Sequence, residues 1–164
     1  MTNRTLLAAT LMFLLAPASA LLAQDDAAPA ELAMEEPEVL IVSSGTIEYA
    51  PIEVPGFDSG IQIAVLSGDP AGDGPYVIRL AFPDGYRFPP HWHPMAENLT
   101  VLEGTFLLAM GESADESAIV EYAPGDYLYI PAEHPHYGGA EGDTEIQLHG
   151  MGPFEINVVG QETD

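Results

Sequence analysis

The chain has 164 residues, contains no cysteine, and carries 26 acidic residues against 3 basic ones, for a formal net charge of -23 at pH 7. Its length corresponds to one domain, which must fold by packing alone because no disulfide can form. A surface this acidic repels nucleic acid and anionic membranes, so we expect neither as a partner.

Residues 1–23 have the composition of a secretory signal peptide. The apolar run TLLAATLMFLLAPASA follows Arg4 and ends in Ala-Ser-Ala, and small residues of this kind precede a signal-peptidase cut. We expect cleavage after Ala20 or Ala23, since the run is too short for a membrane-spanning helix. The alternative, a buried N-terminal helix, lacks a helical period and capping residues. The protein is therefore expected in the periplasm or secreted, with no membrane attachment after cleavage.

Residues 24–38 are rich in Ala, Pro and acid, and this composition predicts a flexible linker. From 39 to 164, short apolar or alternating runs are separated by Gly, Pro and Asp. Many short strands without a long helical period predict an all-β domain, either a sandwich or a barrel. The expected strands cover residues 39–42, 61–66, 76–82, 98–104, 105–110, 127–130, 144–149 and 154–159.

The segment PPHWHP, residues 89–94, places two histidines on one face of an extended chain. Alternate side chains of a strand share a face, so His91 and His93 point one way and Trp92 the other. The flanking prolines restrict the backbone and lower the entropic cost of holding the pair. Two imidazoles held in this way are either a polar decoration or half of a metal site, and the choice depends on whether further ligands lie at suitable distances.

The remaining ligands of such a site are available nearby. Glu97 follows His93 after a short turn, and the segment PAEHPHYGG supplies a further imidazole from either His134 or His136. Three imidazoles and one carboxylate suit Fe, Mn, Co, Ni, Zn or Cu, whereas magnesium and calcium prefer oxygen ligands. The sequence therefore predicts a divalent transition metal as cofactor.

The arrangement around these residues resembles the first motif of the cupin superfamily. That motif runs G, five residues, H-x-H, three or four residues, E, six residues, G. The matching positions are Gly85, His91, His93, Glu97 and Gly104, all at the expected distances.

The second cupin motif is matched in part. It runs G, five residues, P-x-G, two residues, H, three residues, N, and this chain has Gly125, Pro131 and His136 in register. Glu133 stands where glycine is usual, and Ala140 where asparagine is usual. These departures put in doubt the turn geometry and the hydrogen bonding at the strand end, although neither removes a ligand.

The resemblance implies a double-stranded β-helix, a jelly-roll-like barrel, with the metal held inside by His91, His93, Glu97 and His136. The motif selects His136 over His134, which falls in a turn. Cupins with this ligand set include dioxygenases, oxalate-degrading enzymes, isomerases and epimerases, so the fold alone does not choose a reaction. We expect a small exported metalloenzyme with dioxygenase-, oxidase- or isomerase-type chemistry on a small oxygen-rich molecule. The alternative is a non-catalytic periplasmic module that binds a metal or a metabolite.

Two further expectations concern residues outside the motifs. His149 lies in a late predicted strand, where it either lines the same cavity and moves protons as a catalytic residue or is a structural residue of the core or edge. Both readings remain open. The resemblance also implies a homodimer, because cupin barrels commonly pair through exposed strands, and Tyr127 and Tyr129 share one strand face that suits such pairing.

Overall fold

In the computed structural model, which describes residues 38–161, the chain forms one curled antiparallel sheet. The predicted signal peptide, residues 1–23, and all but the last residue of the predicted linker, 24–38, lie outside the described residues. Within the described range, no helix is both long enough and apolar enough to cross a bilayer.

The described residues contain nine strands and two short 3-10 helices. Their bounds, in chain order, are η1 (Ser44–Thr46), β1 (Ala50–Pro51), β2 (Gln62–Ser67), β3 (Pro75–Phe82), β4 (Arg87–Trp92), β5 (Glu97–Met110), η2 (Glu116–Ala118), β6 (Val120–Tyr122), β7 (Tyr127–Ile130), β8 (His136–Met151) and β9 (Asn157–Val158).

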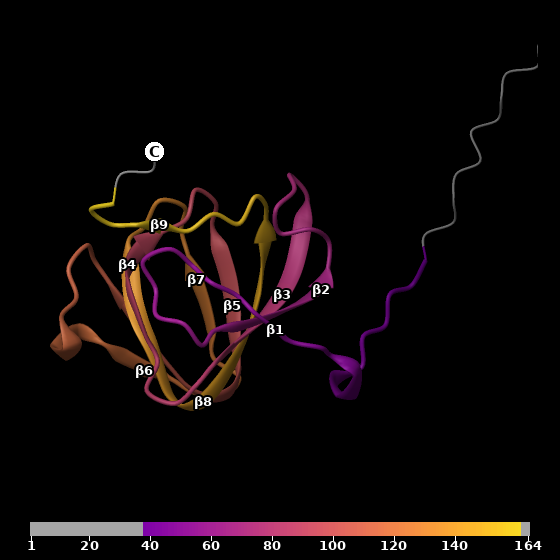
Figure 1. The fold of residues 1–164 in the computed structure, drawn as a ribbon, viewed down its shortest axis with the longest axis horizontal. Helices are drawn as coiled ribbons and strands as arrows, with labels where there is room; N and C mark the ends of the chain where they lie inside the picture. The colour runs from indigo at the N-terminus through magenta and orange to yellow at the C-terminus, as the bar shows by residue number, and fades with distance from the viewer. Residues whose placement is uncertain (1–37, 162–164) are drawn as a thin grey trace, which may run out of the picture. The chain divides into compact units, whose positions relative to one another are not determined.

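The two longest strands, β5 and β8, pair along most of their length and organise the sheet. The first part of β8 also pairs with β4 and its second part with β3, while the other edge of β5 pairs with β6 and β7. Figure 1 shows these strands curling around a common interior. The predicted all-β barrel is confirmed.

Strand alternation fills this interior with apolar side chains. Along β3, Tyr76, Ile78, Leu80 and Phe82 are buried, while Arg79 between them faces outward. Complete burial of an aliphatic or aromatic side chain contributes about 1.5–3 kcal/mol. Equivalent residues on β5, β7 and β8 extend the same core around the barrel.

Some predicted elements differ from the observed ones. Residues 39–42, predicted as a strand, pair with no other strand and are exposed. The segment GGAEGD looks like a turn in the sequence but lies within β8. A Cβ at Gly138 would collide with the carbonyl oxygen of Leu107, so glycine here permits close approach of β5 and β8 rather than a turn. The short strand β6 has too few residues to show a period in the sequence.

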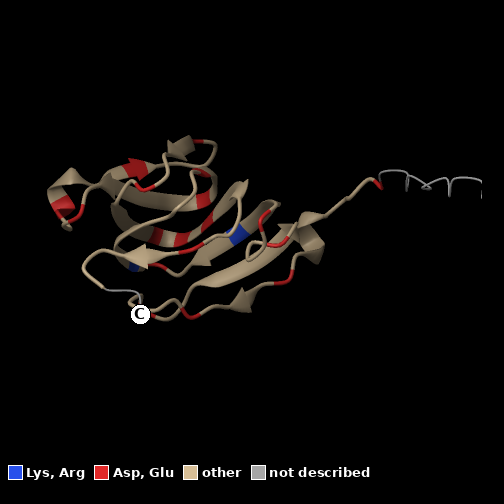
Figure 2. Ribbon diagram, turned by 90° about the horizontal axis from the view of Figure 1, so that it is seen from above, with Lys and Arg blue, Asp and Glu red and all other residues tan. Residues whose placement is uncertain are grey.

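Acidic residues are spread along the loops and strands, as the red segments of Figure 2 show. The two basic residues in the described range are both engaged outside the barrel interior. Arg79 donates to a Glu145 carboxylate oxygen at 2.8 Å. Arg87 donates to two backbone carbonyl oxygens, both at 2.9 Å. Neither cation is available to a ligand inside the barrel.

Candidate metal centre

The PPHWHP segment forms the end of β4, which stops at Trp92, and the first residues after it, and both of its histidines are buried. His91 and His93 are 5% and 4% exposed, while Trp92 between them is half-buried and faces the opposite side. Pro89 and Pro90 have no N–H to donate, and the pairing with β8 is irregular there before it resumes at His91. The observed burial follows the alternation predicted from the sequence.

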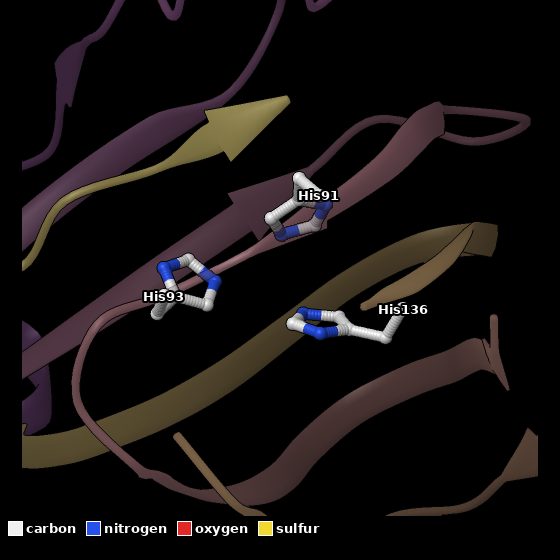
Figure 3. Close-up of side chains that lie close together, drawn as sticks. All are labelled: His91, His93 and His136. Carbon is white, nitrogen blue, oxygen red and sulfur yellow. The ribbon is translucent and has the colours of Figure 1, made fainter. Parts of the chain in front are cut away.

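The other two predicted ligands enter from neighbouring strands. Glu97 begins β5 and His136 begins β8, directly opposite His91, and both are buried. One nitrogen from each of the three imidazoles lies within 4.8 Å of the other two, and Figure 3 shows the rings gathered around a common space. The Glu97 carboxylate oxygens lie 3.3 Å from His93 Nε2 and 3.4 Å from His136 Nε2. Donor atoms about 2.1 Å from one ion are separated by roughly 3–4 Å. The two Glu97 distances match this spacing, while the three imidazole nitrogens lie within a bound of 4.8 Å.

Backbone carbonyl groups determine which nitrogen of each ring is free. In all three histidines, Nδ1 is the ring nitrogen that faces a backbone carbonyl oxygen. A carbonyl oxygen only accepts hydrogen bonds, so Nδ1 must carry the ring proton, and Nε2 keeps its lone pair. A hydrogen bond on the far nitrogen is the usual way in which proteins orient an imidazole toward a metal. The pairs are His91 Nδ1 with Pro89 O at 2.9 Å, His93 Nδ1 with Glu155 O at 2.7 Å, and His136 Nδ1 with His134 O at 3.0 Å.

Burial shifts the pKa of each of these groups in the direction that favours its neutral form. It lowers the pKa of His91 to about 2, with the nearby imidazoles adding to the effect, and it lowers the pKa of His93 to about 4. The pKa of His136 is also lowered by burial. Burial raises the pKa of Glu97 to about 8, and its Oε2 is buried without a hydrogen-bond donor. Neutral imidazoles beside an uncompensated carboxyl group fit a divalent cation, which would supply the missing positive charge.

The four side chains line a cavity of about 50 Å³ inside the barrel. Every other residue that lines this cavity is Ile, Leu, Val or Phe. Phe154 stacks on His93 with ring centroids 4.9 Å apart, and Phe57 packs edge-on against His91 at 5.0 Å. Both phenylalanines come from loops, the first between β8 and β9 and the second between β1 and β2. Sequence reasoning missed them, because a single aromatic residue in a loop has no period.

The remaining two histidines lie outside the cavity. His134 is exposed in the turn before β8, and only its backbone carbonyl reaches the site. His149 is exposed on the outer face of β8, whereas its neighbour Leu148 lines the cavity. The reading in which His149 lines the cavity does not match this orientation, because the two-residue period of the strand turns it outward. We therefore assign it no catalytic role.

The two departures from the second cupin motif are both accommodated by the backbone. Glu133 has φ of 60°, in the left-handed region that favours glycine, and its N–H donates to the His93 carbonyl at 2.8 Å. Ala140 donates its N–H to the Tyr86 carbonyl at 3.0 Å, and its own carbonyl accepts from Arg87. The turn and the strand pairing are therefore retained without the usual side chains.

Comparison with known proteins identifies the fold. Residues 79–151 match the family model described as a cupin domain. The polyketide cyclase RemF from Streptomyces resistomycificus has a similar structure, with a TM-score of 0.64 and 19% identity over 77% of this chain and 89% of that one. So does the DMSP lyase DddQ from Ruegeria pomeroyi DSS-3, with a TM-score of 0.55 and 18% identity over 73% and 64%.

A cupin 2 conserved barrel domain protein from Rhodopseudomonas palustris gives a TM-score of 0.54 and 17% identity, over 70% of this chain and 79% of that one. No curated protein matches the sequence. Identities this low establish a shared fold and no shared activity. The predicted double-stranded β-helix barrel is confirmed.

Proposed function

Because the described barrel is a cupin fold, we propose that this protein binds one divalent transition metal ion through His91, His93, Glu97 and His136. The candidates are Fe, Mn, Co, Ni, Zn and Cu, which accept mixed imidazole and carboxylate ligands. One observation carries the proposal: three buried imidazoles with unprotonated Nε2 atoms gather beside a buried carboxylate oxygen that has no other partner.

We infer that the protein uses this site as a small metalloenzyme with oxygenase-, oxidase- or isomerase-type chemistry on a small molecule. An ion at the site would supply Lewis acidity and, if it is iron, manganese or copper, one-electron chemistry. The chain's own contribution is to keep the imidazoles neutral, orient them through their Nδ1 hydrogen bonds, and surround the ligand with apolar side chains that exclude water.

One observation favours the alternative of a non-catalytic binding module. Apart from the four proposed ligands, no titratable side chain among the described residues lines the cavity, so no separate acid or base is at hand. Turnover of a bound compound, compared under aerobic and anaerobic conditions, separates the two functions. Tight binding with no product in either condition selects the binding module.

Metal content tests the proposal directly. The mature protein, purified without a metal-affinity step, is expected to hold about one ion, and His91→Ala should weaken its binding by more than about a hundredfold while the barrel stays folded. His134→Ala and His149→Ala are matched controls, since both side chains lie outside the cavity, and both should keep the ion. A folded wild-type protein that takes up none of the six metals would overturn the proposal.

Export and pairing belong to the same proposal. Residues 1–23 should direct a reporter out of the cytoplasm, and N-terminal sequencing of the mature protein should start just after Ala20 or Ala23.

For a homodimer, the supporting feature is the outer face of β7, where Tyr127 and Tyr129 are each 59% exposed. Light scattering on the mature protein tests this, and a monomer at micromolar concentration would count against it.

A further inference from the structure

The lining of the cavity points to the class of molecule that enters it. We propose that the site takes a small, uncharged, largely hydrocarbon molecule whose one or two oxygen atoms lie next to the His91, His93 and His136 group. This inference rests on the proposed function and narrows it. It also differs from the oxygen-rich molecule expected from the sequence. Such a molecule would need hydrogen-bond partners along the cavity wall, where the side chains are Ile, Leu, Val and Phe.

Polar atoms away from the imidazoles would have no partner in this cavity. Its surface beyond the four polar residues is made of Ile, Leu, Val and Phe side chains, which neither donate nor accept hydrogen bonds. A hydroxyl group buried there loses its hydrogen bonds to water and gains none, and each such loss weakens binding by about tenfold or more. A polyol or a sugar carries several hydroxyls of this kind, whereas a hydrocarbon skeleton carries none.

Charge gives an independent reason to exclude anions. The chain has a formal net charge of -23, so its surface lowers the local concentration of anionic ligands. The two cations that could offset this inside the barrel are engaged elsewhere, because Arg79 pairs with Glu145 and Arg87 bonds to backbone carbonyls. A carboxylate placed among the Leu and Phe side chains, out of reach of the proposed ion, would therefore be both repelled and unpaired.

The volume of the cavity limits the size of the molecule that it can hold. The cavity of about 50 Å³ has room for a few water molecules, given that one needs roughly 10–15 Å³ of such space. Two of its walls, Val54 with Phe57 and Phe154 with Ile156, belong to loops rather than to strands. This space is smaller than the roughly 150 Å³ that holds a benzene-sized ligand, so a molecule of five or six heavy atoms must displace these loop residues to enter.

Three probes matched in size separate the classes: cyclopentanone, glycerol and lactate. Each is titrated into the metal-loaded mature protein and into the metal-free protein, with binding followed by NMR of the cavity methyl groups. In the metal-free protein, where lactate has no ion to coordinate, cyclopentanone should bind at least about tenfold more tightly than glycerol or lactate, and in the metal-loaded protein it should still bind more tightly than glycerol. Equal or weaker binding of cyclopentanone, including none at all, overturns the inference.

Two valine variants make the test specific to the lining. Val54→Thr places a hydroxyl in the cavity wall at nearly constant shape and should weaken cyclopentanone binding relative to glycerol. Val65→Thr makes the same change on the outer surface, where Val65 is 52% exposed, and should leave both affinities unchanged. An identical response of the two variants would contradict the role of the lining.

The experiment also distinguishes failure of the proposed function from failure of this inference. A protein that takes up no metal refutes the metal site, yet the order of affinities in the metal-free protein still reports on the lining. A protein that loads metal but whose metal-free form prefers glycerol or lactate keeps the metal site and loses the hydrocarbon class.

Discussion

Glu133 occupies a backbone conformation that costs an ordinary residue free energy. Its φ of 60° costs an L-residue about 1–2 kcal/mol relative to a helical or extended conformation, and glycine avoids this cost. We expect Glu133→Gly to raise the free energy of unfolding by about 0.5–1 kcal/mol, because relief of strain is partly offset by the greater freedom of glycine in the unfolded chain. Urea unfolding of the metal-free protein measures this.

Glu133→Ala is the matched control, since it removes the same carboxylate but keeps the Cβ. It should give no comparable gain. If both variants were equally stabilised, loss of negative charge rather than backbone strain would be the cause.

Glu97 gives the metal-free protein a distinct dependence on pH. Its pKa is about 8 in the folded state against 4.5 for an ordinary glutamate, so between these values the folded state holds a proton that the unfolded state has released. Stability contributed by this group is therefore lost as the pH rises through that range, by up to about 1.4 kcal/mol per pH unit. His91 and His93 act in the opposite direction, but only below pH 6.5, where the unfolded chain gains their protons first.

Between pH 6.5 and pH 8, the difference in stability between the wild-type protein and a Glu97 variant reports the titration of Glu97. With a chelator present, the wild-type protein should lose about 2 kcal/mol of stability relative to Glu97→Gln over this window, as measured by urea unfolding. If the free energy of unfolding depended on pH in the same way in both proteins, Glu97 would already be ionised in the folded state. A saturating divalent ion should abolish the difference in slope, since the carboxylate is then paired.

At the scale of elements, the loop between β8 and β9 holds His93 in place. Phe154 stacks on the ring at an interplanar angle of 13°, and the Glu155 carbonyl accepts from its Nδ1. Phe154→Ala removes one of these two constraints, so we expect metal affinity to fall by about 10–100-fold. Competition with a chromophoric chelator measures the affinity, and the visible spectrum of bound Co²⁺ reports on ligand geometry.

Glu155→Gln is the control for this loop, because only the backbone of Glu155 contacts the histidine. It should change the affinity by much less than Phe154→Ala, and Phe154→Leu should be intermediate. Unchanged affinity and an unchanged Co²⁺ spectrum in Phe154→Ala would show that the strands alone position His93.

The metal-ligand positions on the strands could be predicted from the sequence, whereas the loop that covers them could not. Period-two alternation predicts that His91 and His93 share a face, and spacing relative to the cupin motifs selects His136; both depend on local pattern. The path of the loop carrying Phe154 depends instead on distant contacts, such as its N–H bond to the Pro70 carbonyl at 2.7 Å. The outward position of His149 follows from the same alternation, because Ile146 and Leu148 form the apolar face of this strand and His149 lies on the other.

At the scale of the whole molecule, the acidic surface should make stability depend on salt. With 26 acidic and 3 basic residues, the folded chain repels itself, and added salt screens this repulsion. We expect the Tm of the mature protein to rise by about 5 °C between roughly 0.05 M and 0.5 M NaCl. Calorimetry measures the shift, with sucrose at equal osmolality as the control. A flat response to salt would indicate that the acidic groups are too far apart to interact.

The pairing of β4 with β8 has a consequence for how an ion is acquired. His91 and His136 face one another only after these strands have met, and β5, β6 and β7 all lie between them in the chain. The unfolded polypeptide offers an incoming ion little more than two neighbouring imidazoles, too few donors for firm capture. We therefore expect an ion to be loaded only after the barrel has closed, so that the metals available where folding is completed decide which ion is taken.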